Sequence, residues 1–347
     1  MSAQKAWGRA TLRSGGDVPV FSQLESRFPL RLLAPHAASQ NATKTANLNA
    51  GIDSTEKGSH KGIGVLYVVS FGGGLVSGDQ ILLDIDVGSD TRLISLTQGS
   101  TKVYRERRGH DPAAAGLPRP AGPVSLQHMR YIVRPNATLV LLADPVTCFA
   151  RSRYSQLQRV DLRCAETSSL VLLDWFTSGR LAVEAGSGRI PEFWHFYLYH
   201  SRNEVRVAGD VLVRDVQWLE QELPDVLGES NTDLGRRCGP YNCYATLILY
   251  GRECEALCDA LAAEFKQIQQ GQPLRGGATT VPDLLWSLSN LQAEPAAGGA
   301  QATVSRMPGA VIRIASYETD TIKKWLHDHL GHLRKLVGDD MYRVSLG

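Results

Sequence analysis

The stretch VVSFGGGLVSGDQILLDIDV, residues 68–87, decides the fold class because it joins a glycine-rich loop to a regular apolar pattern. Its glycines are followed at once by Asp79 and could suggest a phosphate-binding loop: Gly72, Gly73, Gly74 and Gly78. A nucleotide loop, however, ends in Gly-Lys-Ser/Thr or opens a helix whose N-terminus holds the phosphate. Here the apolar residues at 81, 83, 85 and 87 follow every second position, which predicts a strand. We therefore expect the glycines to form a tight corner between strands, through positive φ or close backbone approach.

The apolar pattern keeps a period near two from residue 62 to about residue 216, with Gly, Pro, Asp or Asn interrupting it. This pattern predicts strands at residues 81–87, 93–97, 129–133, 138–142 and 170–173. The last two are continuous apolar runs, as expected of strands covered on both faces. Asp84 and Asp86 share one face of their strand, which favours a solvated surface over a metal or acid–base site. We predict a mainly β fold.

Two late stretches change to a helical period. In residues 251–271 the apolar positions follow three-and-four spacing, and Gly271 is a suitable stop. In residues 320–338 an apolar stripe contains Ile322, Trp325, Leu326, Leu330 and Leu333. The sequence therefore predicts two amphipathic helices in the C-terminal third.

The length, composition and net charge of the chain argue against several classes of function. The length of 347 residues permits one large or two small domains, and we expect a single domain over residues 1–347. The 37 Lys and Arg against 35 Asp and Glu leave a net charge of +2, which does not favour nucleic acid or an anionic membrane as a partner. No apolar run suits a signal peptide or a membrane span. We expect a cytoplasmic protein whose six cysteines are free thiols.

Three segments are rich in small, polar or proline residues and cannot bury enough apolar surface to offset their ordering entropy: residues 36–61, 105–123 and 292–303. We expect them to be flexible surface loops.

Candidate metal sites in the sequence have structural alternatives. Cys238 and Cys243, or Cys254 and Cys258, could bind zinc, but their spacing is irregular and the second pair falls on the apolar stripe of a predicted helix. In HDHLGHL, residues 327–333, only the histidines at 329 and 332 are helical neighbours. A surface helix rich in polar residues is the favoured interpretation, and metal binding by this pair is the weaker alternative.

Catalytic motifs give no clear reaction. The sequence lacks the Gly-x-Ser-x-Gly elbow and the His-Glu-x-x-His zinc motif. Two general interpretations stay open. One is an enzyme of an extended β fold that uses Asp79, Asp144 and Asp174 as acids or bases. The other is a general interaction module with exposed strand edges.

Five stretches, in this order, resemble the urease accessory protein family UreD, also called UreH: GGGLVSGD (72–79), TQGSTKVYR (97–105), LLADPVTCFARSRYSQ (141–156), LLDWFTSGR (172–180) and SRNEVRVAGDVLVRD (201–215). Together they cover most of residues 62–220. The C-terminal helices agree with the family in pattern only.

The resemblance implies a scaffold without catalytic activity. Its implied fold is mainly β, a helical-like stack of short strands forming packed sheets, with two helices. It implies partners, namely a helical UreF-like protein, through it a UreG-like GTPase, and apo-urease. It further implies nickel in transit through an internal polar tunnel, with no tightly bound cofactor. Oxygen ligands that hold a hydrated divalent ion loosely would let it move on, whereas a His and Cys cage would trap it.

Position by position, the resemblance implies structural roles for Arg180 and the glycines of residues 72–78. The tunnel or nickel-handling candidates are Asp79, Thr97, Ser100, Lys102, Tyr104, Asp144, Asp174 and Glu192. Many bacterial relatives have a glutamate just after the tryptophan that corresponds to Trp175, where this chain has Phe176. Glu192 is our candidate to replace an acidic residue normally found near that segment.

Overall fold

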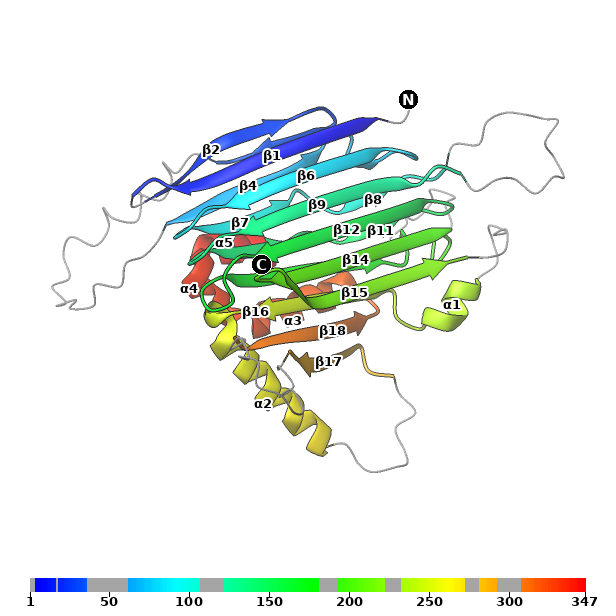
Figure 1. Ribbon diagram of the computed structural model, residues 1–347. Coiled ribbons are helices and arrows are strands. Elements are labelled where there is room, and N and C mark those ends of the chain that lie inside the picture. The colour runs from blue at the N-terminus through cyan, green and yellow to red at the C-terminus, as the bar shows by residue number, and fades with distance from the viewer. Residues whose placement is uncertain are drawn as a thin grey trace, which may run out of the picture.

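The computed structural model describes residues 4–16, 18–35, 62–106, 122–180, 192–221, 232–271, 281–291 and 307–347. Two stacked β-sheets form the body of the protein (Figure 1). The mainly β fold predicted from the sequence is confirmed. The predicted loops at 36–61 and 292–303, and most of 105–123, lie outside the described residues.

The first sheet, sheet A, has seven strands. In spatial order they are β15 (Asp210–Glu220), β14 (Leu198–Val207), β12 (Arg153–Leu162), β9 (Ser125–Val133), β6 (Gln80–Val87), β1 (Lys5–Ser14) and β2 (Pro19–Ser26). The strands from β14 to β1 are parallel, and an antiparallel strand lies at each edge.

The second sheet, sheet B, has eleven strands. Its main path is β17 (Leu284–Asn290), β18 (Gly309–Ser316), β16 (Cys243–Tyr250), β13 (Ser169–Thr177), β10 (Thr138–Leu142), β7 (Arg92–Thr97), β4 (Ile63–Ser70) and β3 (Leu30–Leu33). The short strands β5 (Gly74–Leu75), β8 (Thr101–Val103) and β11 (Val146–Cys148) pair beside this path.

The chain winds between the sheets. Strands β4, β7, β10 and β13 belong to sheet B, whereas the intervening β6, β9, β12 and the following β14 belong to sheet A. Because each turn of the chain returns to the same sheet in the same direction, neighbours within a sheet are parallel. This winding is the helical-like stack that the family resemblance implies, and it places residues distant in sequence on facing strands.

Two apolar cores hold the layers together. The larger fills the space between the sheets, and the second lies between the outer face of sheet B and the C-terminal helices. Strands β10 and β13 are buried along their whole length because sheet B is covered on both faces. The continuous apolar runs predicted strands covered on both faces, so that expectation is confirmed.

The helices are α1 (Asp233–Cys238), α2 (Glu255–Gly271), α3 (Thr319–His329), α4 (Arg334–Val337) and α5 (Asp339–Leu346), with 3-10 turns η3 (Arg252–Cys254) and η4 (Gly331–Leu333). The first predicted amphipathic helix corresponds to α2. The stripe predicted for the second is buried, but it does not lie on one helix. The α-helix ends at His329, and η4 and α4 follow, so the expectation of one continuous helix there is wrong.

The glycine corner connects β4 to β6 as predicted. Gly72, Gly73 and Gly78 have φ of 84°, 70° and 86°, a region that residues with a Cβ atom rarely adopt. Gly74 has a different reason to be glycine, since a Cβ atom there would lie 2.1 Å from the carbonyl oxygen of Lys102 on β8. Strand β6 follows the corner, so the motif has the architecture of a strand connection and not of a nucleotide loop.

Candidate functional site

Asp174 is the centre of a buried polar network between the sheets. It lies on β13 and faces sheet A, where its carboxylate accepts hydrogen bonds from Gln156 Nε2 at 3.0 Å, Ser201 Oγ at 2.6 Å and Asn203 Nδ2 at 2.7 Å. These donors come from β12 and β14. A carboxylate with three donors is well satisfied, which makes its burial tolerable.

The network extends along sheet A and runs in one direction. The single Tyr154 hydroxyl proton is shared between Gln127 Oε1 at 2.5 Å and Gln156 Oε1 at 2.7 Å, and Gln156 Nε2 donates onward to Asp174. Gln158 Nε2 likewise donates to Asn203 Oδ1 at 3.1 Å. Asp174 is thus the common acceptor of two donor chains.

Burial raises the pKa of Asp174 above its ordinary value of 3.8, and the nearby charge of Asp215 adds to this effect. The hydrogen bonds from Ser201, Asn203 and Gln156 act in the opposite direction. Asp215 itself pairs with Arg313 Nη2 at 2.6 Å. The carboxyl of Asp174 is therefore easier to protonate than an exposed aspartate.

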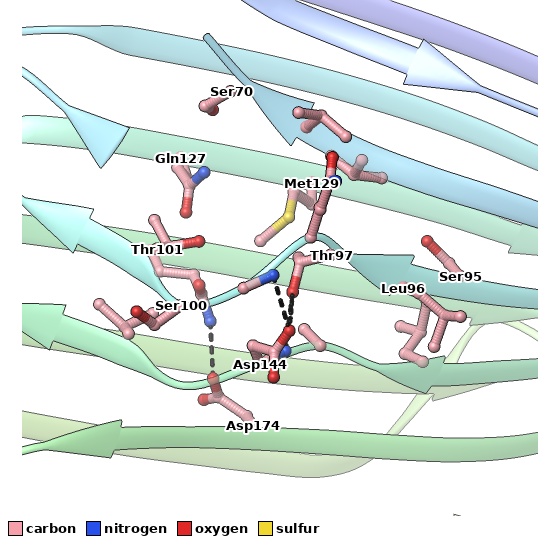
Figure 2. Close-up of a pocket in the computed structure, with 18 of the residues that line it drawn as sticks. Ser70, Ser95, Leu96, Thr97, Ser100, Thr101, Gln127, Met129, Asp144 and Asp174 are labelled. Atoms are coloured by element: carbon pink, nitrogen blue, oxygen red, sulfur yellow. Dashed lines mark hydrogen bonds between the residues drawn. The ribbon is translucent and has the colours of Figure 1, made fainter. Parts of the chain in front are cut away.

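A cavity of about 90 Å³ adjoins this network (Figure 2). Sheet B contributes Asp174, Thr97 and Ser95, and sheet A contributes Gln127 and Gln156 among the lining side chains. The volume has room for several water molecules, and the lining offers each of them hydrogen-bond partners. The arrangement can hold a small hydrated species among oxygen and amide groups.

A second polar corner lies at the same cavity, where β7 and β10 end. Asp144 Oδ2 accepts from the Gly99 amide at 3.0 Å and contacts Thr97 Oγ1 at 3.3 Å. On the other side of this corner, a further hollow of about 90 Å³ shares Thr97 and Asp144 as lining residues. There Lys323 Nζ of α3 approaches Asp144 Oδ1 to 4.0 Å, next to the chain end at Gly347.

The structure brings some of the predicted site residues together and separates others. Thr97, Ser100, Asp144 and Asp174 line one cavity. Asp79 and Tyr104 line a different hollow, which is more apolar and bounded by Phe28 and Phe71. The three aspartates of the enzyme alternative are therefore divided between two places.

Asp79 performs a structural task in its hollow. It is 4% exposed, and its two carboxylate oxygens accept from the backbone amides of Gln4 and Val76, each at 2.8 Å. The Tyr104 hydroxyl donates to the Gly72 carbonyl at 2.8 Å. These bonds fix the glycine corner against the N-terminal strand.

Glu192 lies at a third place. Its carboxylate accepts from the Ala150 amide at 2.8 Å and pairs with Arg180, whose guanidinium lies over the Phe149 ring at 4.5 Å. Lys102 is exposed on β8. Phe176 is buried between the sheets and stacks on Tyr199 with ring centroids 4.1 Å apart.

The candidate metal ligands are dispersed. In the ranges that the structure describes, no three His, Cys, Asp or Glu side chains lie together so that they could hold a metal ion. Cys254 and Cys258 are buried in the helical core, as their apolar spacing predicts. His329 contacts the Trp325 carbonyl and Glu264, and His332 lies beyond the end of α3.

Sequence reasoning missed the sheet A half of the site: Gln127, Tyr154, Gln156, Ser201 and Asn203. A signal for part of it exists in β12, where Tyr154, Gln156 and Gln158 occupy the buried face that Val160 and Leu162 continue. Glutamines on an apolar face indicate a buried polar network, because buried amides need partners.

The fold and site define a two-sheet β protein with an internal polar cavity. A family model described as "UreD urease accessory protein" matches residues 5–345. The chain belongs to the UreD family of urease accessory proteins, and this membership supports a role in urease maturation.

Individual relatives agree with the family match. Urease accessory protein 4 of Cryptococcus neoformans var. grubii is 30% identical over 96% of this chain and 93% of its own length. Urease accessory protein D of Oryza sativa subsp. indica is 30% identical, covering 92% and 90%. UreD of Sorangium cellulosum is 29% identical, covering 93% and 78%.

One further observation concerns membranes. Among the helices of the described ranges, none combines the length and apolar character required to cross a bilayer.

Proposed function

We propose that this chain is a nonenzymatic urease maturation factor that helps deliver nickel to apo-urease through its internal polar cavity. In this role it links a UreF-type helical protein, and through it a UreG-type GTPase, to the urease. The observation that carries the proposal is the buried Asp174 network beside a cavity lined from both sheets. Nickel is the cargo, and it leaves with the acceptor protein.

The chemistry of the lining supports passage more than storage. The side chains around the cavity offer carboxylate, hydroxyl and amide groups, which are weaker ligands for nickel than thiolate or imidazole. Nearby Cys148 is fully buried, and burial raises the pKa of its thiol to about 12, so it stays neutral. An ion in such a cavity keeps part of its water shell and can move on.

The position of the Thr97–Asp144 corner supports a path that leads from the cavity toward the C-terminal helices. It borders the cavity between the sheets and also the hollow below α3 and α5. An ion leaving Asp174 would next reach Asp144. The Lys323 ammonium would compete with the ion for the Asp144 carboxylate and so lower the affinity of Asp144 for it. Asp174 and Asp144 would thus be two successive binding sites along the path, each of moderate affinity for nickel.

The decisive experiment is nickel analysis of urease from cells that lack this chain. Cells grown at low nickel should contain urease protein with little metal, and the wild-type gene should restore loading. Asp144→Asn should restore loading only in part. A matched control is Asp339→Asn, which alters a carboxylate that is 65% exposed on α5 and outside both hollows. Fully loaded urease in the deletion strain at low nickel would refute the proposal.

A further inference from the structure

The outer face of sheet A is open to solvent although its inner strands are parallel. In β12 every second residue is buried against sheet B, and the alternate residues point outward and are partly exposed. Figure 1 shows this sheet as a broad layer of successive strands. Parallel sheets in proteins almost always have both faces covered. This face is therefore suited to a cover that another molecule supplies.

The end of this face formed by β12, β14 and β15 has a distinct composition. Cross-strand pairing places Arg159, Glu204 and Arg214 in one row, and Arg202 beside Val216 in the next. We use the name arginine face for the outward side chains Arg159, Arg202, Arg206, Arg214, Val216 and Trp218. Tryptophan and arginine are the residues most enriched at the energetic centres of protein interfaces.

One carboxylate serves all four arginines of this face. Glu204 is 3% exposed and accepts from Arg206 Nε at 2.7 Å, while Arg159 Nη2 approaches to 3.2 Å and Arg214 Nε to 3.4 Å. Arg202 also donates to it, and this bond lowers the pKa of Glu204 to about 2. Four guanidinium groups share this carboxylate, and their side chains stay 30–51% exposed. The cluster therefore keeps surplus positive charge that a partner can reach.

The apolar part of the face is held in a fixed position. Trp218 is 58% exposed, yet its ring packs on His200 with centroids 4.8 Å apart and its indole N–H donates to Glu220 at 3.1 Å. Val216, two residues away on the same edge strand, is 49% exposed. A preoriented tryptophan loses little conformational entropy when a partner covers it.

We propose that the arginine face is a docking site for a protein surface rich in carboxylates around an apolar contact that covers Trp218. Carboxylates fit the surplus guanidinium donors, often in bidentate pairs. A nucleic acid fits less well, because Asp161 and Glu220 interrupt the positive charge and would repel a regular phosphate backbone. This inference rests on the proposed function in one respect, the choice of the UreF-type protein and apo-urease as the binding partners to test.

The test compares full-length variants in binding to each purified partner at about 50 mM and about 300 mM salt. Trp218→Ala should weaken the Kd for one partner roughly thirtyfold, the size of an interface hot spot. Arg214→Gln removes a charge without adding a carboxylate beside Glu204, and it should reduce the salt dependence of binding. The controls are Leu285→Ala, which truncates a side chain 52% exposed on β17, and Lys335→Gln on α4.

The outcomes are separable. Weaker binding by Trp218→Ala and less salt-dependent binding by Arg214→Gln, with unchanged controls and unchanged unfolding midpoints, support the docking site. Wild-type binding by both face variants overturns it, as does a wild-type chain that binds neither partner. If duplex DNA competes with the protein partner for binding, the proposal is overturned in favour of nucleic acid. If the wild type is a dimer that Trp218→Ala dissociates, it is overturned in favour of a second copy of this chain. Urease nickel content in the deletion strain decides the proposed function independently of these results.

Discussion

Replacing Asp174 tests whether the buried network is both a structural and a functional element. Asp174→Ala leaves the donors of Gln156, Ser201 and Asn203 without their acceptor. A buried donor without a partner costs about 1–3 kcal/mol. Because the adjoining cavity of about 90 Å³ can supply water, we expect the lower end for each donor, about 3 kcal/mol in total. Asp174→Asn keeps one acceptor oxygen and should cost about 1 kcal/mol.

The pH dependence adds a second signature. Burial raises the pKa of Asp174, so between its ordinary value of 3.8 and the raised value the native state binds a proton that the unfolded state has released. The stability of the wild type therefore falls as pH rises through that window. Asp174→Asn cannot titrate there, so the advantage of the wild type over this variant should shrink as pH increases.

Urea denaturation at about pH 5 and about pH 8 measures both the loss of unfolding free energy in each variant and its pH dependence. The denaturant slope m should be the same for the variants and the wild type. Nickel loading of urease by Asp174→Asn then separates function from folding, because this variant is expected to fold. Wild-type stability of Asp174→Ala at both pH values would refute the network as a stabilising element. Full nickel loading by both variants would remove Asp174 from the proposed path.

Three further predictions concern other parts of the fold. Gly74→Ala should lower the free energy of unfolding by about 2–3 kcal/mol, because the new methyl group meets the Lys102 carbonyl; equal stability to wild type in a thermal melt would contradict this. Asp79→Ala should cost about 2–4 kcal/mol through loss of two backbone hydrogen bonds, with Asp79→Asn intermediate in urea titrations. Glu204→Gln should reduce the loss of unfolding free energy that accompanies acidification. In the wild type the Arg202 bond lowers the Glu204 pKa from 4.5 to about 2, so the ionised Glu204 stabilises the fold above pH 4.5 and this stabilisation is lost as pH falls toward 2. An unchanged acid transition in that variant would show that other carboxylates govern it.

The sequence determined the features that depend on neighbouring residues. Alternation at residues 81–87 predicted β6, and the continuous runs predicted that β10 and β13 are buried on both faces. The strand after Gly78 distinguished a corner from a nucleotide loop. Periodicity carries such information because side-chain direction in a strand or helix is set locally. The local pattern gave a wrong prediction near Gly331, because the apolar stripe stays buried there while the α-helix ends at His329.

Only the tertiary structure decided which polar residues meet. Asp174 and Thr97 lie on strands of sheet B, and Gln156 and Asn203 lie on strands of sheet A. No local period relates these positions, because their distances depend on the register between strands and on the stacking of two sheets. For the same reason the sequence placed Asp79 with Asp144 and Asp174, whereas the fold puts it in a separate hollow. The family motifs pointed to residues of sheet B such as Asp174 and Thr97, but only long-range packing shows which side chains of sheet A lie beside them.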